Sequence, residues 1–138
     1  MRRTERRARA RALQAIYAWD VRGAEAPLER TAAQVWDDLA VPPVERSLAA
    51  QHIKRLAAHQ AALDLTLREI TANWRLERLG AVERSVLRLA ASELAHAETP
   101  PRVVLQEAVR LAERFGSEAS AKFVNGVLDA FARAAGRL

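Results

Sequence analysis

The sequence has no cysteine among its 138 residues, and it contains only five glycines and five prolines. Without cysteine the chain can form neither a disulfide nor a thiolate metal site, which fits a reducing compartment such as the cytoplasm. Scarce glycine and proline, abundant alanine and leucine, and the lack of β-branched runs all favour helices. We therefore expect an all-α, cytoplasmic protein that is long enough to bury one hydrophobic core.

Long apolar runs are absent as well. The Arg-rich start resembles the basic beginning of a signal peptide, but residues 12–20 after it are amphipathic and too short to act as its apolar region. We expect no signal peptide, no membrane-spanning helix and no membrane partner.

Residues that could hold a metal or carry catalysis are few and poorly spaced. His52 and His59 are seven positions apart, not the three or four that would place two ligands on one helical face, and His96 is isolated. No serine lies in a nucleophile elbow, and no glycine-rich phosphate loop is present. The sequence therefore predicts no enzyme, no metal site and no cofactor.

Two acids on predicted apolar faces, Glu93 and Glu107, need a separate explanation. Paired carboxylates can perform acid–base catalysis, but no other part of an active site accompanies them. Carboxylates on such faces are more often held in structural ion pairs, and Arg84, Arg88 and Arg110 are candidate partners. We interpret both acids as structural.

Hydrophobic periodicity and the positions of glycine and proline predict six or seven helices with short connections. The predicted helices cover residues 4–21, 28–39, 44–73, 81–97, 102–115 and 118–135, with a turn or short helix at 74–79. Val35, Trp36 and Leu39 should form the buried face of the second of these helices. We expect a single domain, 1–138, with an N-terminal subdomain at 1–73 and a C-terminal subdomain at 74–138.

The excess positive charge is concentrated at the N-terminus. Residues 1–11, which we call the Arg-rich segment, contain six arginines and one acid, whereas the rest of the chain holds 16 basic and 16 acidic residues. Clustered arginines neutralise phosphates with release of counterions, so nucleic acid is the first candidate partner. The alternative is a solvated, frayed charge run. The candidate RNA-binding residues of this segment are Arg2, Arg3, Arg6, Arg7 and Arg9.

Tyr17 is the aromatic residue best placed to extend such an interface. It follows Arg6 by eleven positions, almost three helical turns, so the two side chains share a face about 16 Å apart. An aromatic ring beside arginines suits single-stranded nucleic acid, because bases stack on the ring. The alternative is a half-buried core tyrosine.

Polar and aromatic residues alternate again at residues 122–126. Periodicity alone favours packing here, with Phe123 and Val127 facing inward on the last helix. In the alternative interpretation Phe123 is a second stacking platform, with Lys122 and Asn125 beside it for phosphates and base edges.

Several blocks of the chain together resemble the NusB family of bacterial transcription antitermination factors. The blocks are Arg6-Arg7-Ala8-Arg9, Leu13-Gln14-Ala15-Ile16-Tyr17-Ala18-Trp19, Trp74-Arg75-Leu76-Glu77-Arg78-Leu79, Val86-Leu87-Arg88-Leu89-Ala90, Phe115-Gly116 and Lys122-Phe123-Val124-Asn125-Gly126-Val127-Leu128. The resemblance covers nearly the whole chain, and its specific parts are the last block and Leu87-Arg88-Leu89-Ala90 upstream of it.

The resemblance implies an all-α fold of two packed helical bundles and a role in processive transcription of ribosomal RNA operons. It implies pairing with the ribosomal protein NusE, binding to the boxA element of nascent RNA, and work within the RNA polymerase antitermination complex. By position, RNA would contact Arg6, Arg7, Arg9, Tyr17, Lys122, Phe123 and Asn125, and NusE would contact Glu77 and Glu83. Ala119 stands where the family often has aspartate. A homodimer of the free protein is also possible.

Two other functions stay open at this point. Similar helical domains occur at the start of RNA cytosine methyltransferases, but those chains continue into a cofactor-binding α/β domain, whereas this sequence ends at Leu138. A generic helical interaction protein with an acidic partner is the second alternative.

Overall fold

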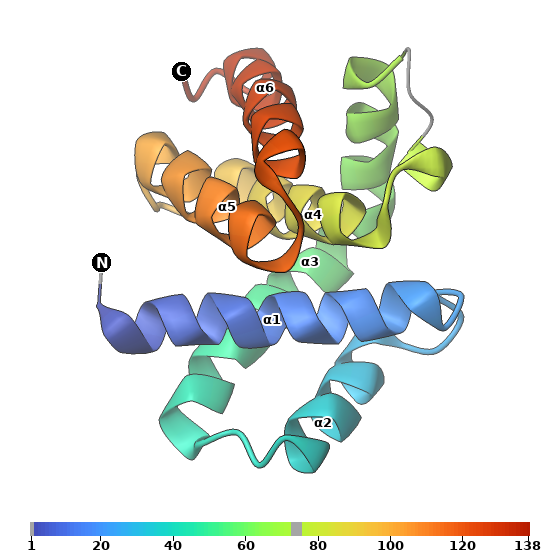
Figure 1. Ribbon diagram of the computed structural model, residues 1–138, viewed down its shortest axis with the longest axis vertical. Helices are drawn as coiled ribbons and strands as arrows, with labels where there is room; N and C mark the ends of the chain where they lie inside the picture. The colour runs from blue at the N-terminus through green and yellow to red at the C-terminus, as the bar shows by residue number, and fades with distance from the viewer. Residues whose placement is uncertain (1, 73–75) are drawn as a thin grey trace.

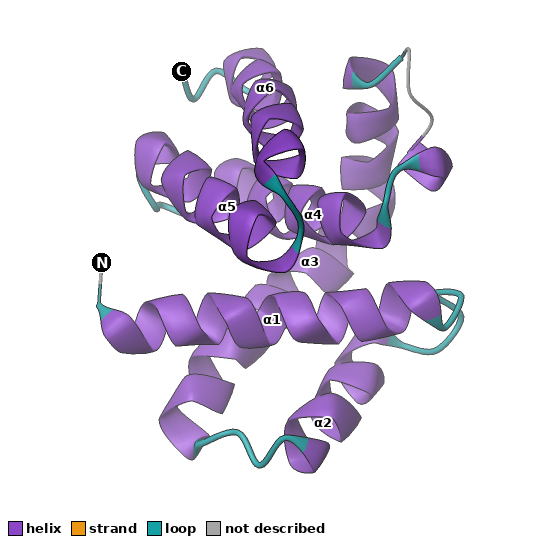
Figure 2. Cartoon of the chain, in the orientation of Figure 1, coloured by secondary structure: helices purple, strands orange, loops and turns teal. Residues whose placement is uncertain are grey.

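The computed structural model describes residues 2–72 and 76–138, and within these ranges the chain is helical with no strand (Figure 2). The elements are α1 (Arg3–Val21), α2 (Leu28–Asp38), α3 (Pro43–Ile70), the 3-10 helix η1 (Leu76–Arg78), α4 (Ala81–His96), α5 (Pro101–Phe115) and α6 (Glu118–Ala134). The predicted all-α fold is confirmed, and six α-helices lie in the part of the chain that is described.

The helices form two packed bundles joined by α3 (Figure 1). α1 and α2 lie with the first part of α3 at the bottom of the view, whereas α4, α5 and α6 lie with its last part at the top. At 28 residues, α3 is long enough to pass through both bundles, and it packs against α1, α2, α4 and α6. The predicted subdomain boundary at residues 73 and 74 lies outside the described residues.

The helix ends follow the local sequence closely. α3 and α5 each begin on a proline, Pro43 and Pro101, because the first helical position needs no backbone N–H. Ser117 caps α6 by accepting a hydrogen bond from the Ser120 backbone N–H at 3.1 Å. One prediction fails at such an end: Leu39 is 46% exposed, since α2 ends at Asp38 and its last turn directs Leu39 to solvent.

α1 packs against helices of both bundles, namely α2, α3 and α4. Its inner face carries small residues, and Ala8, Ala12 and Ala15 are fully buried, which lets α1 approach its neighbours closely. Larger side chains complete the contact: Ile16 is fully buried, and Trp19 donates its indole N–H to the Ala26 carbonyl at 2.7 Å. The interior of the protein is therefore apolar along most of α1.

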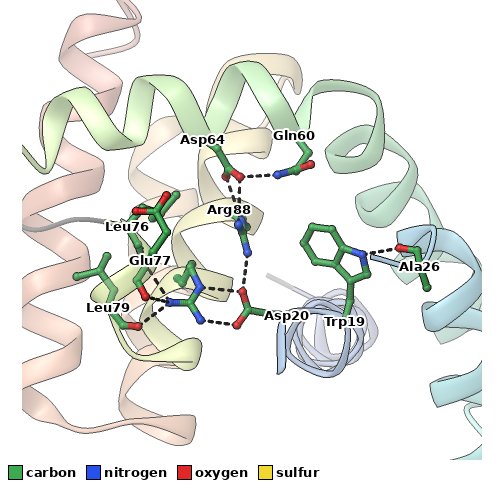
Figure 3. Close-up of polar contacts among 10 residues, drawn as sticks. Trp19, Asp20, Ala26, Gln60, Asp64, Leu76, Glu77, Leu79 and Arg88 are labelled. Atoms are coloured by element: carbon green, nitrogen blue, oxygen red, sulfur yellow. Dashed lines mark hydrogen bonds and ion pairs between the residues drawn. The ribbon is translucent and has the colours of Figure 1, made fainter. Parts of the chain in front are cut away.

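A buried polar network joins three helices near the end of α1 (Figure 3). Asp20 of α1 accepts hydrogen bonds from Arg84 Nε at 2.7 Å and Arg88 Nη1 at 2.8 Å, both on α4. Arg88 also binds Asp64 of α3 through two parallel bonds of 3.0 Å. Arg84 reaches the Leu79 carbonyl at 2.6 Å, which ties the segment before α4 into the same network.

The charges of this network compensate one another. Burial by itself would raise the pKa of Asp20, but hydrogen bonds and positive charge from Arg84, then from Arg88, outweigh it and lower the pKa below its ordinary value. Asp20 therefore stabilises the fold in its charged form. A buried charge that loses its partner is costly, so the network is sensitive to any single removal.

We expect Asp20→Ala to lower the free energy of unfolding by about 3–5 kcal/mol, because it leaves Arg84 and Arg88 without their shared carboxylate. Asp37→Ala is the matched control: Asp37 pairs with Arg46 on the surface, and its loss should cost less than about 1 kcal/mol. Urea denaturation at neutral pH measures both. Equal losses in the two variants would contradict a special role for the buried network.

The same variant has a defined pH dependence. Because the pKa of Asp20 is lowered by folding, its stabilisation is present above the ordinary value of 3.8 and is lost as the pH falls below it. The difference between wild type and Asp20→Ala should therefore be largest near neutral pH and shrink in acid. A difference that stays constant down to low pH would show that the charge of Asp20 is not what stabilises the fold.

Candidate nucleic-acid interface

The Arg-rich segment is not a separate arm, because it forms the first half of α1 from Arg3 onward. Three ion pairs attach it to other helices in the part of the chain that the structure describes. Arg6 Nε lies 3.2 Å from Glu107 of α5, Arg9 Nε lies 3.2 Å from Glu93 of α4, and Arg11 Nε lies 2.7 Å from Glu45 of α3. Much of the N-terminal positive charge therefore serves packing.

Arg9 is the clearest case of such structural use. It is 6% exposed, and Glu93 is 2% exposed. Burial would raise the pKa of Glu93, but the hydrogen bonds and charge of Arg9 outweigh it and lower the pKa. The Arg9 guanidinium is enclosed between α1 and α4, so we assign Arg9 a structural role in place of the predicted RNA contact.

The expected structural ion pairs of the two acids are present with different partners. Glu93 is held by Arg9 and Glu107 by Arg6, whereas Arg84 and Arg88, which the sequence offered as partners, bind Asp20 and Asp64. The guanidinium groups that neutralise these acids come from α1, which is distant in sequence. Helical periodicity carries no information about such pairings.

Four arginines of the Arg-rich segment lie at the surface. Arg2, Arg3 and Arg7 are exposed, and the side chain of Arg6 is 43% exposed beside its bond to Glu107. Arg3 and Arg7 are one helical turn apart, so they share a face of α1. These cations remain available to a polyanion.

Tyr17 lies on α1 at the edge of a groove of about 220 Å³. The groove is lined by Leu13, Gln14 and Tyr17 of α1, Val82 of α4 and Phe115 of α5. Tyr17 is 43% exposed, so its ring packs on one side and is open to solvent on the other. Phe115, which the sequence indicates only within the block Phe115-Gly116, contributes a second ring to this groove and is partly buried.

Phe123 lies in a second groove, of about 300 Å³, beside the first turn of α4. Glu83 of α4 and Ala119, Ser120 and Phe123 of α6 are among its lining residues. Val127, one turn later on the helix, is buried in the core. Phe123 is only partly buried: it packs against the core and also lines the groove. Lys122 and Asn125 are exposed on the same helix.

The two grooves meet at the first turn of α4. Val82 lines the groove of Tyr17, and the next residue, Glu83, lines the groove of Phe123. Tyr17 and Phe123, far apart in the sequence, therefore line two grooves on a surface that includes the first turn of α4. We call this surface, with the exposed arginines of the Arg-rich segment, the aromatic–basic surface.

The two acids predicted to face a protein partner have different surroundings. Glu83 is partly buried and accepts a hydrogen bond from the Ser120 hydroxyl, which joins α4 to α6. A Cβ at Gly80 would lie 2.3 Å from Glu83 Oε2, so the glycine makes room for this carboxylate. Glu77 is exposed on η1 and lies 2.8 Å from Arg68 Nε of α3.

The histidines show one contact that the sequence did not indicate. His59 of α3 and His96 of α4 stack with ring centroids 3.6 Å apart, so His96 is not isolated. Among the described residues, no three histidine, cysteine, aspartate or glutamate side chains come close enough to hold a metal ion. In the same ranges, no helix is both long and apolar enough to cross a membrane.

Comparison with known proteins identifies the family. Residues 6–133 match the NusB family. A protein of Anaeromyxobacter dehalogenans named transcription antitermination protein NusB is 43% identical over 126 residues, covering 89% of this chain and 86% of its own length. A protein of the same name from Sorangium cellulosum is 44% identical over 128 residues, covering 92% and 90%.

Solved structures agree with this match. T. maritima NusB superposes with a TM-score of 0.85 at 32% identity, covering 96% of this chain and 93% of the other. A structure of the antitermination factors NusB and NusE in complex with dsRNA gives a TM-score of 0.84 at 29% identity, covering 97% of this chain and 99% of the matched one. Its sequence and its fold together show that the chain belongs to the NusB family.

Proposed function

We propose that this chain is an RNA-binding transcription antitermination factor. It pairs with the ribosomal protein NusE, binds the boxA element of nascent ribosomal RNA, and supports processive transcription within the RNA polymerase antitermination complex in the cytoplasm. The observation that carries the proposal is the aromatic–basic surface, in which the grooves of Tyr17 and Phe123 share the first turn of α4 and exposed arginines lie on α1, the helix of Tyr17. The names of the relatives support the same role.

In the proposed role the arginines and the aromatic rings bind different parts of the RNA. Arg2, Arg3, Arg6 and Arg7 supply affinity by contacting phosphates, which every RNA presents. Tyr17 and Phe123 receive unstacked bases, and Lys122 and Asn125 reach phosphates and base edges near Phe123. Selectivity then comes from the grooves and from the partner protein, not from the arginines.

We place NusE binding at the acidic residues Glu77 and Glu83, beside the groove of Phe123. One chain of a solved structure of NusB and NusE with dsRNA has the same fold as this protein over 97% of this protein's length, which supports a shared mode of assembly. Glu83 and Glu77 flank the start of α4, next to the groove of Phe123. A partner bound there would extend the RNA-binding surface.

The direct test is binding of purified NusE and of a boxA-containing RNA to the purified chain. We expect a ternary complex, and RNA binding that is tighter with NusE than without it. If neither NusE nor the RNA binds, the proposed function is wrong.

The exposed arginines of α1 should contribute to the salt dependence of RNA binding. Arg3→Gln with Arg7→Gln removes two phosphate contacts, and the slope of log affinity against log salt should fall by about 1.4. Deleting residues 1–11 is a poorer test, because it also removes the ion pairs of Arg9 and Arg11. The control is Arg22→Gln with Arg30→Gln, because both arginines are exposed and neither belongs to the aromatic–basic surface. Equal slopes in both variants would contradict phosphate contacts on α1.

Tyr17 should act through its ring. Tyr17→Ala is expected to weaken RNA binding by about 1–3 kcal/mol, because stacking of one base is lost, whereas Tyr17→Phe should bind like wild type. Fluorescence anisotropy with a labelled RNA measures both. Full affinity in Tyr17→Ala would return Tyr17 to a purely structural role.

Glu83 should favour NusE through its charge. Glu83→Gln removes the charge but keeps an oxygen for the Ser120 hydroxyl, so the fold should persist while NusE affinity falls severalfold and depends less on salt. Glu29→Gln, an exposed change on α2, is the control. Calorimetric titration with NusE that gives the same affinity for both variants would exclude Glu83 from the interface.

A further inference from the structure

A second set of arginines lies across a groove from the Arg-rich segment. This groove, of about 550 Å³, runs between the first turns of α1 and the last turns of α5, and Arg6, Glu107, Arg110, Leu111, Glu113 and Arg114 line it. Arg110 and Arg114 are exposed and one helical turn apart, so both guanidinium groups are on the same face of α5. The Arg6–Glu107 ion pair holds the two walls together.

The charges in this groove are not equivalent. Glu107 is 6% exposed and is already neutralised by Arg6, so it opposes an incoming anion little. Arg110 and Arg114 form no ion pair in the described ranges 2–72 and 76–138. Two acids are among the described residues that line the groove, and of these Glu107 is buried and Glu113 is exposed. The groove therefore presents a net positive charge.

The groove also leads to the aromatic part of the surface. The Arg114 guanidinium carbon lies 4.8 Å from the centre of the Phe115 ring, a cation–π distance. Phe115 in turn lines the groove of Tyr17. A path along the last turns of α5 therefore connects Arg6 with the groove of Tyr17.

We propose that Arg110 and Arg114 bind phosphates of the RNA, so that the RNA-binding surface extends from α1 across the groove onto the last turns of α5. The inference rests on the proposed function. An RNA backbone is favoured over an acidic protein segment because the cations continue an aromatic-lined path, which suits unstacked bases. Since phosphate contacts carry no sequence information, these two arginines add affinity for any RNA that follows this path.

The test uses Arg110→Gln with Arg114→Gln in the full chain, with and without NusE. Both side chains are exposed, so the variant should fold like wild type by circular dichroism. Its slope of log affinity against log salt should fall by about 1.4, and its affinity at about 0.1 M salt should fall roughly ten- to thirtyfold. The loss should be equal for a boxA RNA and a scrambled RNA. The control, Arg22→Gln with Arg30→Gln, removes the same charge elsewhere.

The outcomes separate this inference from the proposed function. Absence of RNA binding by the wild-type chain with NusE would overturn the proposed function and this inference with it. Wild-type binding with the same slope in the α5 variant and the control would overturn the α5 inference alone. Loss of NusE affinity in the α5 variant with an unchanged RNA slope would also overturn it, because the arginines would then belong to the protein interface.

Discussion

The network of Asp20, Asp64, Arg84 and Arg88 is the interaction on which the rest of the structure depends. Each charge is buried and would be costly alone, so the network is favourable only when α1, α3 and α4 are all in place. Apolar packing tolerates small shifts between helices, but paired guanidinium and carboxylate groups do not, because their hydrogen bonds are directional. The network therefore fixes the position of α1 along α4. Asp20 follows Tyr17 by less than one turn, and Arg84 follows Val82 and Glu83 directly. The same bonds thus set the positions of both grooves.

The N-terminal charge has two uses that the sequence does not separate. Arg9 and Arg11 are directed inward and hold α1 on α4 and α3, whereas Arg2, Arg3 and Arg7 are directed outward. Because the inward arginines hold the helix rigidly, the outward ones are presented at fixed positions on the helix that carries Tyr17. A flexible arm with the same composition would lose conformational entropy on binding RNA, and a packed helix loses less. The surface is therefore preorganised by the ion pairs that reduce its net charge.

Secondary structure was predictable because its causes are local. Proline pairs, glycines and the helical spacing of apolar residues located the six helices to within a few residues. Leu39 was placed wrongly, since a residue one position beyond a helix end no longer follows its periodicity. The site was predictable in part: the family blocks indicated Tyr17 and Phe123 as contact residues, but no role was predicted for Phe115. Its place in the groove depends on how α5 crosses α1, which no local pattern encodes.

The sequence by itself determined the helices, the absence of cysteine chemistry, the concentration of arginine at one end, and the resemblance to the NusB family. These follow from composition, periodicity and short motifs, each of which acts within a few turns of chain. Only the tertiary structure decided which arginines of α1 are exposed, that Glu93 and Glu107 are neutralised from α1, that His59 stacks on His96, and that Arg110 and Arg114 lie opposite Arg6. The physical reason is that pairing between charges or rings depends on distance in space, and helices far apart in sequence meet only after the core has packed.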